Sequence, residues 1–282
     1  MLNKNNNFIG CESEYDAAKV VVFGAPFDGT TSYRPGTRFA SKRMREESYG
    51  IETFSPYLNK DLSETLVCDA GDLELSIGNT TKVLEEIESF SSQIITAEKI
   101  PLMIGGEHLV TLGAVKAIIK KYNNLHILHF DAHADLRNDY LGEKLSHSTV
   151  MRRIHDLVGD KKIYQFGIRS GEKEEFLFAQ KHTFMNRFTL EGIEYAIKAI
   201  GNEPVYLSID LDIIDPSEFP ATGTPEAGGV RFIDLIKAIN NVGKLNIVGC
   251  DICELSPPYD FSGISTALAC KFLRELLLSI TK

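Results

Sequence analysis

The chain has 282 residues and an ordinary composition for a folded protein, which is enough for one large α/β domain or two small ones. Its net charge of −9, from 39 acidic and 30 basic residues, argues against nucleic acid or an anionic membrane as a partner and suits a small cation. No apolar run reaches the roughly 20 residues of a membrane span, and the Asn-rich start lacks the apolar core of a signal peptide. Five scattered cysteines, an odd number, suit reduced thiols in a cytoplasm.

Short apolar runs bounded by Gly, Pro or Asp recur along the chain and predict about eight strands. In chain order they are Val20–Ala25, Leu66–Ala70, Leu102–Ile104, His126–Phe130, Ile163–Ile168, His182–Phe184, Val205–Ile209 and Asn246–Ile252. Segments of helical periodicity lie between them, and four carry clear apolar stripes that begin at Val83, Val115, Ile233 and Leu268. This alternation predicts βαβ units, and therefore an α/β fold with a parallel sheet and helices on both faces.

The organisation of the chain is simple, because it has no low-complexity linker and no internal repeat. We therefore expect one domain that spans residues 1–282. Residues 1–17 are predicted to form an N-terminal arm outside the sheet, either as a frayed end or as a contact to another subunit. Cys250 and Cys253 have CxxC spacing but lie inside a predicted strand, so we interpret both as core thiols.

The stretch 125–135 begins apolar and ends in three potential metal ligands, Asp131, His133 and Asp135. Its apolar part is typical of a short buried strand in a parallel sheet. Alternate side chains of an extended backbone point to the same side, so these three can converge on one point beyond the strand. Open α/β sheets place their sites at this edge. The alternative is a strand end with solvated polar residues.

Three other predicted strand ends carry residues of the same types. His108 follows the turn 105–107, whose glycines permit close backbone approach, and it heads a predicted helix. Asp210 and Asp212 follow another strand at alternate positions, and Glu254 ends the last strand. Each motif alone also fits an ordinary structural role, such as a helix cap, an Asp-x-Asp loop or a salt bridge.

Taken together, the candidate metal ligands are four carboxylates and two imidazoles. They are His108, Asp131, His133, Asp135, Asp210 and Asp212. This oxygen-rich set suits hard divalent ions and argues against a structural zinc site. Six side chains are too many for one ion with an open position, but they suit two ions that share carboxylates. Two divalent ions balance four carboxylates, and a bridging hydroxide then leaves a centre that attracts a cation.

These motifs together resemble the arginase/agmatinase (ureohydrolase) family, and within it the agmatinases. The matching segments are Gly105–His108, Asp131–Asp135, Ser208–Pro216, Thr222–Glu226 and Asp251–Pro257, with a weaker match at Arg34–Arg38. They span nearly the whole chain. The resemblance implies a three-layer α/β/α sandwich with a mainly parallel sheet of about eight strands. It also implies two Mn²⁺ ions per subunit and a homo-oligomer, a trimer or a hexamer.

The resemblance assigns the six ligands to two ions. One ion would be held by His108, Asp131, Asp135 and Asp210, and the other by Asp131, His133, Asp210 and Asp212. In this arrangement Asp131 and Asp210 bridge the two ions.

Two further residues match functional positions of the family. His147 matches its proton-shuttling histidine, a task that the pKa range of histidine suits. Glu254 matches the carboxylate that receives the guanidinium, which a carboxylate can hold with two hydrogen bonds. The remaining histidines match no motif, and the first two are predicted to pack in or near the core. They are His126, His129, His155 and His182.

The implied reaction is hydrolysis of a linear guanidino compound, with agmatine and water giving putrescine and urea. We hypothesise that two bound ions lower the pKa of a water, which then attacks the guanidinium carbon held by Glu254. Asp135 would steady the hydroxide and pass its proton to the departing amine. His147 would exchange protons with solvent.

Position 137 bears on the substrate, because arginases of this family carry there an Asn that meets the substrate's carboxylate. This chain has Arg137, and its neighbouring loop resembles agmatinases. Arg137 would either clamp a carboxylate, as a guanidinobutyrase or another guanidino-acid hydrolase requires, or point away into a subunit contact. Glu172 matches the family loop that meets the substrate's amine, so we expect it to receive an ammonium group. Alternatively, Glu172 is a solvent-exposed charge on a helix.

Two other functional classes compete with this hypothesis. A metallophosphoesterase also places DxH and Asn-His motifs on two metals, but here the order of the motifs is reversed and no His-x-His is present. A cluster rich in carboxylates would also repel a phosphate. A non-catalytic interaction protein with the same fold is the other alternative. Against it, all six ligand positions are filled, as are those of His147 and Glu254.

Overall fold

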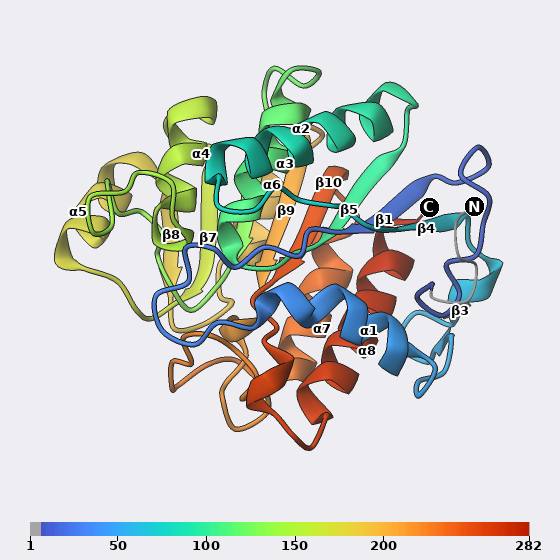
Figure 1. The fold of residues 1–282 in the computed structure, drawn as a ribbon. Helices are drawn as coiled ribbons and strands as arrows, with labels where there is room; N and C mark the ends of the chain where they lie inside the picture. Colours follow the sequence, from blue (N-terminus) through green and yellow to red (C-terminus); the bar gives the residue numbers. More distant parts are fainter. Residues whose placement is uncertain (1–6, 282) are drawn as a thin grey trace.

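The central element of the fold is one parallel sheet (Figure 1), seen in a computed structural model that describes residues 7–281. Its eight strands within the described residues run in the order β4-β1-β5-β10-β9-β6-β7-β8. They are β1 Val20–Gly24, β4 Val67–Asp72, β5 Ile100–Ile104, β6 His126–Phe130, β7 Ile163–Ile168, β8 Phe184–Arg187, β9 Pro204–Asp210 and β10 Asn246–Cys253. A small antiparallel pair, β2 Phe54–Ser55 and β3 Lys60–Asp61, stands apart from this sheet. The predicted fold class is confirmed.

Helices cover both faces of the sheet and give the molecule three layers (Figure 1). They are α1 Ala40–Ser48, α2 Thr80–Thr96, α3 Thr111–Ile119, α4 Val150–Val158, α5 Lys173–His182, α6 Ile193–Ile200, α7 Phe232–Val242 and α8 Ile264–Ile280. Helices α2 to α5 pack on one face, and α1, α6, α7 and α8 pack on the other. Every apolar run predicted as a strand overlaps a strand of the sheet. One boundary is wrong, because His182 is the last residue of α5 and β8 begins only at Phe184.

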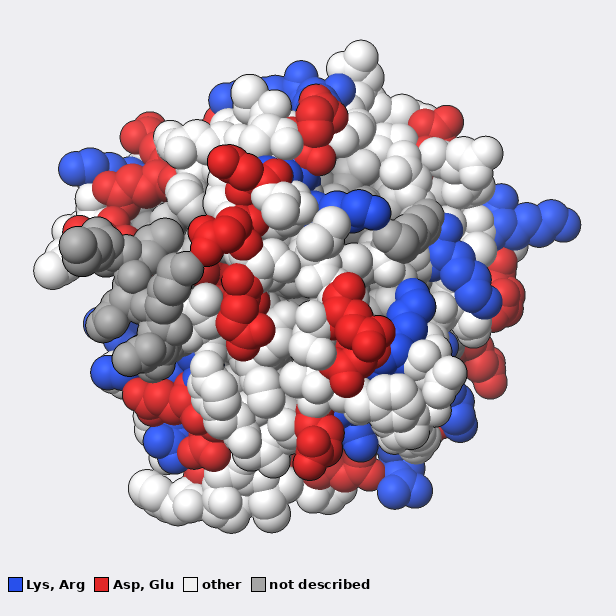
Figure 2. All heavy atoms as spheres, turned by 90° about the vertical axis from the view of Figure 1, so that its right-hand side faces the viewer, with Lys and Arg blue, Asp and Glu red and all other residues white. Residues whose placement is uncertain are grey.

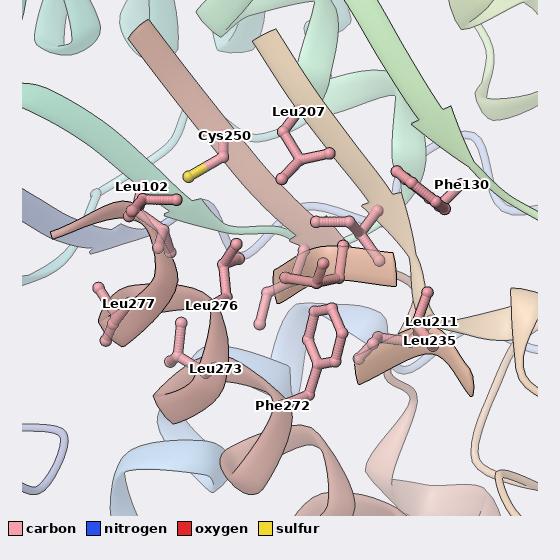
Figure 3. Packing of buried hydrophobic residues seen from close by; sticks show 14 of the residues in the cluster. Leu102, Phe130, Leu207, Leu211, Leu235, Cys250, Phe272, Leu273, Leu276 and Leu277 are labelled. Atoms are coloured by element: carbon pink, nitrogen blue, oxygen red, sulfur yellow. The ribbon is translucent and has the colours of Figure 1, made fainter. Parts of the chain in front are cut away.

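The core is built from alternate strand residues that face the two helical layers. Figure 3 shows Leu102 of β5 and Leu207 of β9 against the buried side chains of Phe272 and Leu276 on α8. Cys250 belongs to this layer, whereas Cys253 packs in the opposite one. The two CxxC thiols therefore lie on opposite faces of β10, which confirms that they are separate core residues.

The described part of the N-terminal arm lies along the edge strand β4. Phe8 is fully buried, and its N–H donates to the carboxylate of Asp69 at 2.8 Å. Glu12 forms an isolated antiparallel bridge with Cys68 of β4. Residues 1–6 of the predicted arm lie outside the described residues. The single-domain assignment and the subunit contact stay predictions.

The surface carries charges of both signs. On the face shown in Figure 2, acidic and basic side chains are interspersed, without one large field of a single sign. Among the helices of residues 7–281, none is long and apolar enough to cross a membrane.

Candidate metal centre

Four neighbouring strands bring the candidate ligands to one place at the carboxyl edge of the sheet. His108 begins the 3-10 turn that follows β5, and Asp210 is the last residue of β9. Asp131 directly follows β6, and Glu254 directly follows β10. Because β5, β10, β9 and β6 are adjacent in the sheet, residues that are distant in the sequence become neighbours here.

The turn after β5 has no room for side chains at its two glycines. A Cβ atom on Gly106 would lie 1.8 Å from the carbonyl oxygen of Phe27, and one on Gly105 would lie 2.4 Å from Sγ of Cys253. The carbonyl of Gly106 accepts a hydrogen bond from the N–H of Glu254 at 3.0 Å. The glycines thus let three loops meet closely beside the ligands.

A first group of ligand atoms gathers around the ring of His108. Its Nδ1 lies 3.0 Å from Oδ2 of Asp131 and 3.1 Å from Oδ2 of Asp135. The same nitrogen is 3.5 Å from Oδ2 of Asp210. With His129, the first three form a group whose ligand atoms all lie within 4.8 Å of one another. A single cation could therefore contact several of them.

A second group gathers around His133 and shares Asp131 with the first. His133 Nδ1 lies 2.9 Å from Oδ2 of Asp212 and 3.5 Å from Oδ1 of Asp131. Asp210 stands between the groups, because its Oδ1 accepts the N–H of Asp212 at 2.8 Å while its Oδ2 faces His108. The structure thus brings all six predicted ligands together in two adjoining groups.

Two orphaned atoms show that this cluster fits metal ions. Nδ1 of His108 and Oδ2 of Asp212 are buried, yet neither makes a well-aligned hydrogen bond within residues 7–281. A buried polar atom without a partner costs about 1–3 kcal/mol. The two atoms belong to different groups, so one cation in each group would satisfy both. Histidine nitrogens and carboxylate oxygens are suitable donors for such ions.

The repulsion among the carboxylates of the cluster also favours the binding of cations. Burial raises the pKa of Asp210 well above its usual value, and the neighbouring carboxylates of Asp212 and Asp131 raise it further. Burial and the charge of Asp131 raise the pKa of Asp135 to about 7. Burial lowers the pKa of His133, but the carboxylates of Asp212 and Asp131 outweigh it and raise the pKa well above its usual value. The carboxylates repel one another unless positive charge lies between them.

A cavity of about 600 Å³ opens over the cluster. Six of the predicted site residues line it: His108, His133, Asp135, His147, Asp210 and Glu254. Asp131 and Asp212 are buried and do not line it. The cavity therefore gives a small molecule access to one side of the metal ligands.

His147 lies at the cavity wall, at the start of the 3-10 turn that precedes α4. Its N–H donates to Oγ1 of Thr30 at 3.1 Å, and its ring nitrogens lie 3.3 Å from Oγ of Ser32 and 3.2 Å from Oγ of Ser146. Burial lowers the pKa of His147 to about 4. The ring is therefore neutral near neutral pH and can accept a proton.

Glu254 reaches the cavity from a strained turn. Its φ of 65° lies in the left-handed region, as does the φ of 54° at Asp135, and both are uncommon for residues other than glycine. An oxygen of Glu254 accepts the N–H of His108 at 2.8 Å. Burial raises the pKa of this carboxyl well above its usual value, and the charge of Glu107 raises it further. A cation beside Glu254 would stabilise its ionised form.

Glu172 and Arg137 lie differently from the sequence expectation. Glu172 caps α5 outside the cavity lining, with 55% of its side chain exposed, and pairs with Arg137 at 2.8 Å. Arg137 lines the cavity, and its guanidinium lies over the ring of Tyr140 at 4.9 Å from the centroid. Glu175 and Glu226, which the sequence did not single out, line the cavity instead. The substrate role of Glu172 stays a prediction.

His129 is a partner of the cluster that the sequence reasoning missed. It is buried, as predicted, but its Nε2 lies 2.7 Å from Oδ2 of Asp131. Its Nδ1 lies 3.1 Å from the side-chain nitrogen of Gln165 on β7. The alternation that groups Asp131 with His133 reaches His129 when it is extended one step towards the N-terminus. This alternation could therefore have predicted from the sequence that His129 faces the cluster.

Comparison with known proteins identifies the family. Residues 18–279 match the arginase family. The chain is 46% identical to an agmatinase from Bacillus cereus over 98% of this chain and 96% of that one. It is 35% identical to a guanidinobutyrase from Pseudomonas aeruginosa, over 94% and 87% of the two chains. A structure from Clostridium difficile, provisionally assigned as an agmatinase, is 54% identical and covers 95% of this chain and 99% of its own, with a TM-score of 0.92.

The chain belongs to the arginase family. Members of this family are hydrolases that act on guanidino compounds at a binuclear metal centre, and the His/Asp cluster described above agrees with such a centre. The family resemblance and the prediction of an enzyme are confirmed.

Proposed function

We propose that this protein is an agmatinase, which hydrolyses agmatine to putrescine and urea with two Mn²⁺ ions. One observation carries the reaction class: a buried carboxylate, Glu254, lines the same cavity as four of the six candidate metal ligands, His108, His133, Asp135 and Asp210. The choice of agmatine is supported by the agmatinase relative that is 46% identical over 98% of the chain. Putrescine as the product would give the protein a role in polyamine biosynthesis.

The six ligand side chains divide between two ions in this proposal. His108, Asp131, Asp135 and Asp210 would hold one, and Asp131, His133, Asp210 and Asp212 the other. The orphaned Nδ1 of His108 and Oδ2 of Asp212 support this division, because one falls to each ion. Bound Mn²⁺ would supply the attacking hydroxide at neutral pH by lowering the pKa of a water.

The other residues of the cavity orient the substrate and move protons. Glu254 would hold the guanidinium with two parallel hydrogen bonds and thereby fix its plane over the ligand cluster. Asp135 would keep the proton of the attacking water and deliver it to the departing nitrogen. His147, neutral and at the wall of the cavity, would exchange protons between the site and solvent. The products are urea and a free amine.

A second candidate substrate is a guanidino acid such as 4-guanidinobutyrate. Arg137 favours it, because a guanidinium group lining the cavity can pair with a carboxylate. Against it, Arg137 already pairs with Glu172, and the additional carboxylates of Glu175 and Glu226 line the cavity. An ammonium group suits these carboxylates, whereas a substrate carboxylate is repelled by them.

The substrate is tested by kcat/KM for agmatine, arginine and 4-guanidinobutyrate on one manganese-loaded preparation, with urea as the readout. We expect agmatine to lead by about 10²-fold or more, because an unmatched carboxylate in a buried site costs a few kcal/mol. If arginine or 4-guanidinobutyrate is the better substrate, the agmatine assignment is wrong and the hydrolytic chemistry stands. Phosphatase activity without urea release would contradict both.

The cellular setting completes the proposal. We propose a cytoplasmic homo-oligomer, a trimer or a hexamer. The cytoplasm is supported by five buried cysteines, none of which forms a disulfide within residues 7–281. The oligomer rests on the family resemblance alone. Light scattering of the purified protein tests it, and a monomer would contradict it.

A further inference from the structure

We propose that His155, Asp160 and His182 form a second metal site that binds a borderline divalent ion such as Zn²⁺. Nε2 of His155 lies 2.8 Å from Oδ1 of Asp160, and Nδ1 of His182 lies 2.7 Å from the same oxygen. The three ligand atoms all lie within 4.8 Å of one another. Small shifts would place all three at about 2.0–2.2 Å from one ion.

The imidazoles are held in place before any ion arrives. The ring of Phe178 stacks on His182 with centroids 4.2 Å apart and meets His155 edge-on at 4.9 Å. The guanidinium of Arg152 covers the Phe178 ring at 3.8 Å. Because Phe178 contacts both histidines, it fixes their relative orientation and reduces the entropy lost on binding. Nδ1 of His155 is buried without a well-aligned partner in the described part of the chain.

The backbone brings the three ligands from two helix ends. His155 lies in the last turn of α4, and Gly159, with a φ of 84°, turns the chain so that Asp160 comes back beside it. His182 is the last residue of α5. An ion here would join the C-terminal ends of α4 and α5, so it would stabilise the fold.

This site lies away from the centre proposed for hydrolysis. Asp160 precedes β7, which begins at Ile163, and His182 precedes β8, which begins at Phe184. Both therefore lie at the amino edge of the parallel sheet, whereas the His108 cluster lies at its carboxyl edge. The second site has no part in the proposed reaction and does not depend on the substrate assigned above.

The ligand set selects the kind of ion. Two imidazoles and one carboxylate suit Zn²⁺ and neighbouring transition metals better than Mn²⁺ or Mg²⁺, which prefer oxygen. Side-chain exposures of 63% at Asp160, 32% at His182 and 14% at His155 leave one side open for a water ligand. The competing arrangement is a metal-free pair of hydrogen bonds, in which both imidazoles donate to Asp160.

Zinc binding to the manganese-loaded enzyme decides between these arrangements. After limiting Zn²⁺ is added and excess is removed, both metals are counted per chain and the melting temperature is recorded. We expect the wild type to keep about one zinc more than His182→Ala or Asp160→Asn, at equal manganese, and to gain thermal stability from zinc. Urea release should be the same in all three proteins.

Asp156→Asn is the matched control, because Asp156 also lies on α4, its side chain is 53% exposed and its Oδ1 lies 4.0 Å from Nδ1 of His155, which is not the proposed ligand atom. It should bind zinc like the wild type. Equal zinc in the wild type, His182→Ala and Asp160→Asn would overturn the proposal. So would zinc that enters only by displacing manganese. If His182→Ala does not fold, the comparison between Asp160→Asn and Asp156→Asn gives the same decision.

Discussion

At the scale of single residues, the candidate ligands are oriented by buried hydrogen-bond relays. Nε2 of His108 contacts Oγ of Ser208 at 2.9 Å, and that hydroxyl donates to Asp251 at 2.9 Å. This relay leaves Nδ1 of His108 free to face the cluster. His129 acts similarly on Asp131 from the other side. Such partners fix the tautomer and the direction of a ligand, and their loss typically weakens metal binding 10–100-fold.

Replacement of a shared carboxylate tests the binuclear assignment. Asp210→Asn removes a negative charge that lies between both ligand groups, so we expect loss of about one metal per subunit or more and near-complete loss of activity. Metal analysis after desalting and urea release measure the two effects. Asp234→Asn, at an exposed position on α7, is the control and should change neither. Two retained metals with ordinary turnover in Asp210→Asn would disprove the assignment.

Replacement of His147 should separate proton transfer from metal binding. Its ring nitrogens lie against Ser32 and Ser146 and not against the carboxylates, so His147→Ala should keep its metals. The rate should fall by about 10²–10⁴-fold, as is usual for a proton-transfer group. Urea release across pH and metal content measure both outcomes. An unchanged rate and pH profile would make His147 a structural residue.

At the scale of elements, the loop from residue 215 to 230 forms one wall of the cavity. Asp215 accepts hydrogen bonds from the N–H groups of Gly228 at 2.8 Å and Gly229 at 2.9 Å, which closes the base of the loop. The guanidinium of Arg169 donates to the carbonyls of Asp212 at 2.7 Å and Glu226 at 2.8 Å. Arg169 thus links this loop to the turn that carries Asp212 by donating to backbone carbonyls of both.

Asp215→Ala should loosen this loop without removing a ligand. We expect lower kcat/KM, unchanged metal content and a loss of stability of roughly 1 kcal/mol, because several hydrogen bonds to a partly exposed carboxylate are lost. Thermal melts and substrate kinetics measure these effects. Asp234→Ala is the control, since that carboxylate is exposed and pairs with Lys237 of the same helix at 3.2 Å. Lost metal in Asp215→Ala would contradict this view of the loop.

The stability that Asp215 contributes should decrease at acidic pH. Hydrogen bonds from the hydroxyl and the N–H of Ser217 lower the pKa of Asp215 from 3.8 to about 2. Because the folded-state pKa lies below the unfolded value, the stabilisation is fully present above about pH 4. It is lost as pH falls towards 2. The melting temperatures of the wild type and Asp215→Ala should therefore converge only in that acidic range.

At the scale of the whole molecule, the cysteines are scattered through the fold and shielded from solvent. All five are buried and free of disulfides within residues 7–281. Burial raises the pKa of Cys270 to about 12 and also raises the pKa values of the other four thiols. A thiol that is both buried and protonated is a poor nucleophile.

The folded protein should therefore resist thiol reagents. At pH 8 we expect no rapid reaction with a disulfide reagent such as dithiobis(nitrobenzoate), and five reactive thiols after denaturation. Absorbance of the released thiolate gives the count in each state. Any slow reaction in the folded state should follow the rate of local opening and increase on mild heating. A fast thiol in the native protein would show that part of the core is open to solvent.

The sequence by itself predicted the strands and the candidate metal ligands of this protein. Both depend on local rules, since a buried parallel strand is a short apolar run and alternate residues of extended chain share a side. Asp131 and His133 were therefore identifiable without a fold, whereas Asp135, with a φ of 54°, leaves the extended backbone on which this rule depends. The adjacency of four strand ends followed from the general rule for parallel sheets. The sequence did not predict helices that lack a long apolar stripe, such as α5.

Only the tertiary structure decided which acidic residues face the cavity. Glu172 and Glu175 are three residues apart on α5, but only Glu175 turns inwards, where it accepts the N–H of Leu136 at 2.8 Å. That choice depends on how α5 docks against the loop after β6. The meeting of His155 with His182 likewise requires two helix ends to pack side by side. Contacts of this kind join distant segments, and periodicity within one segment carries no information about them.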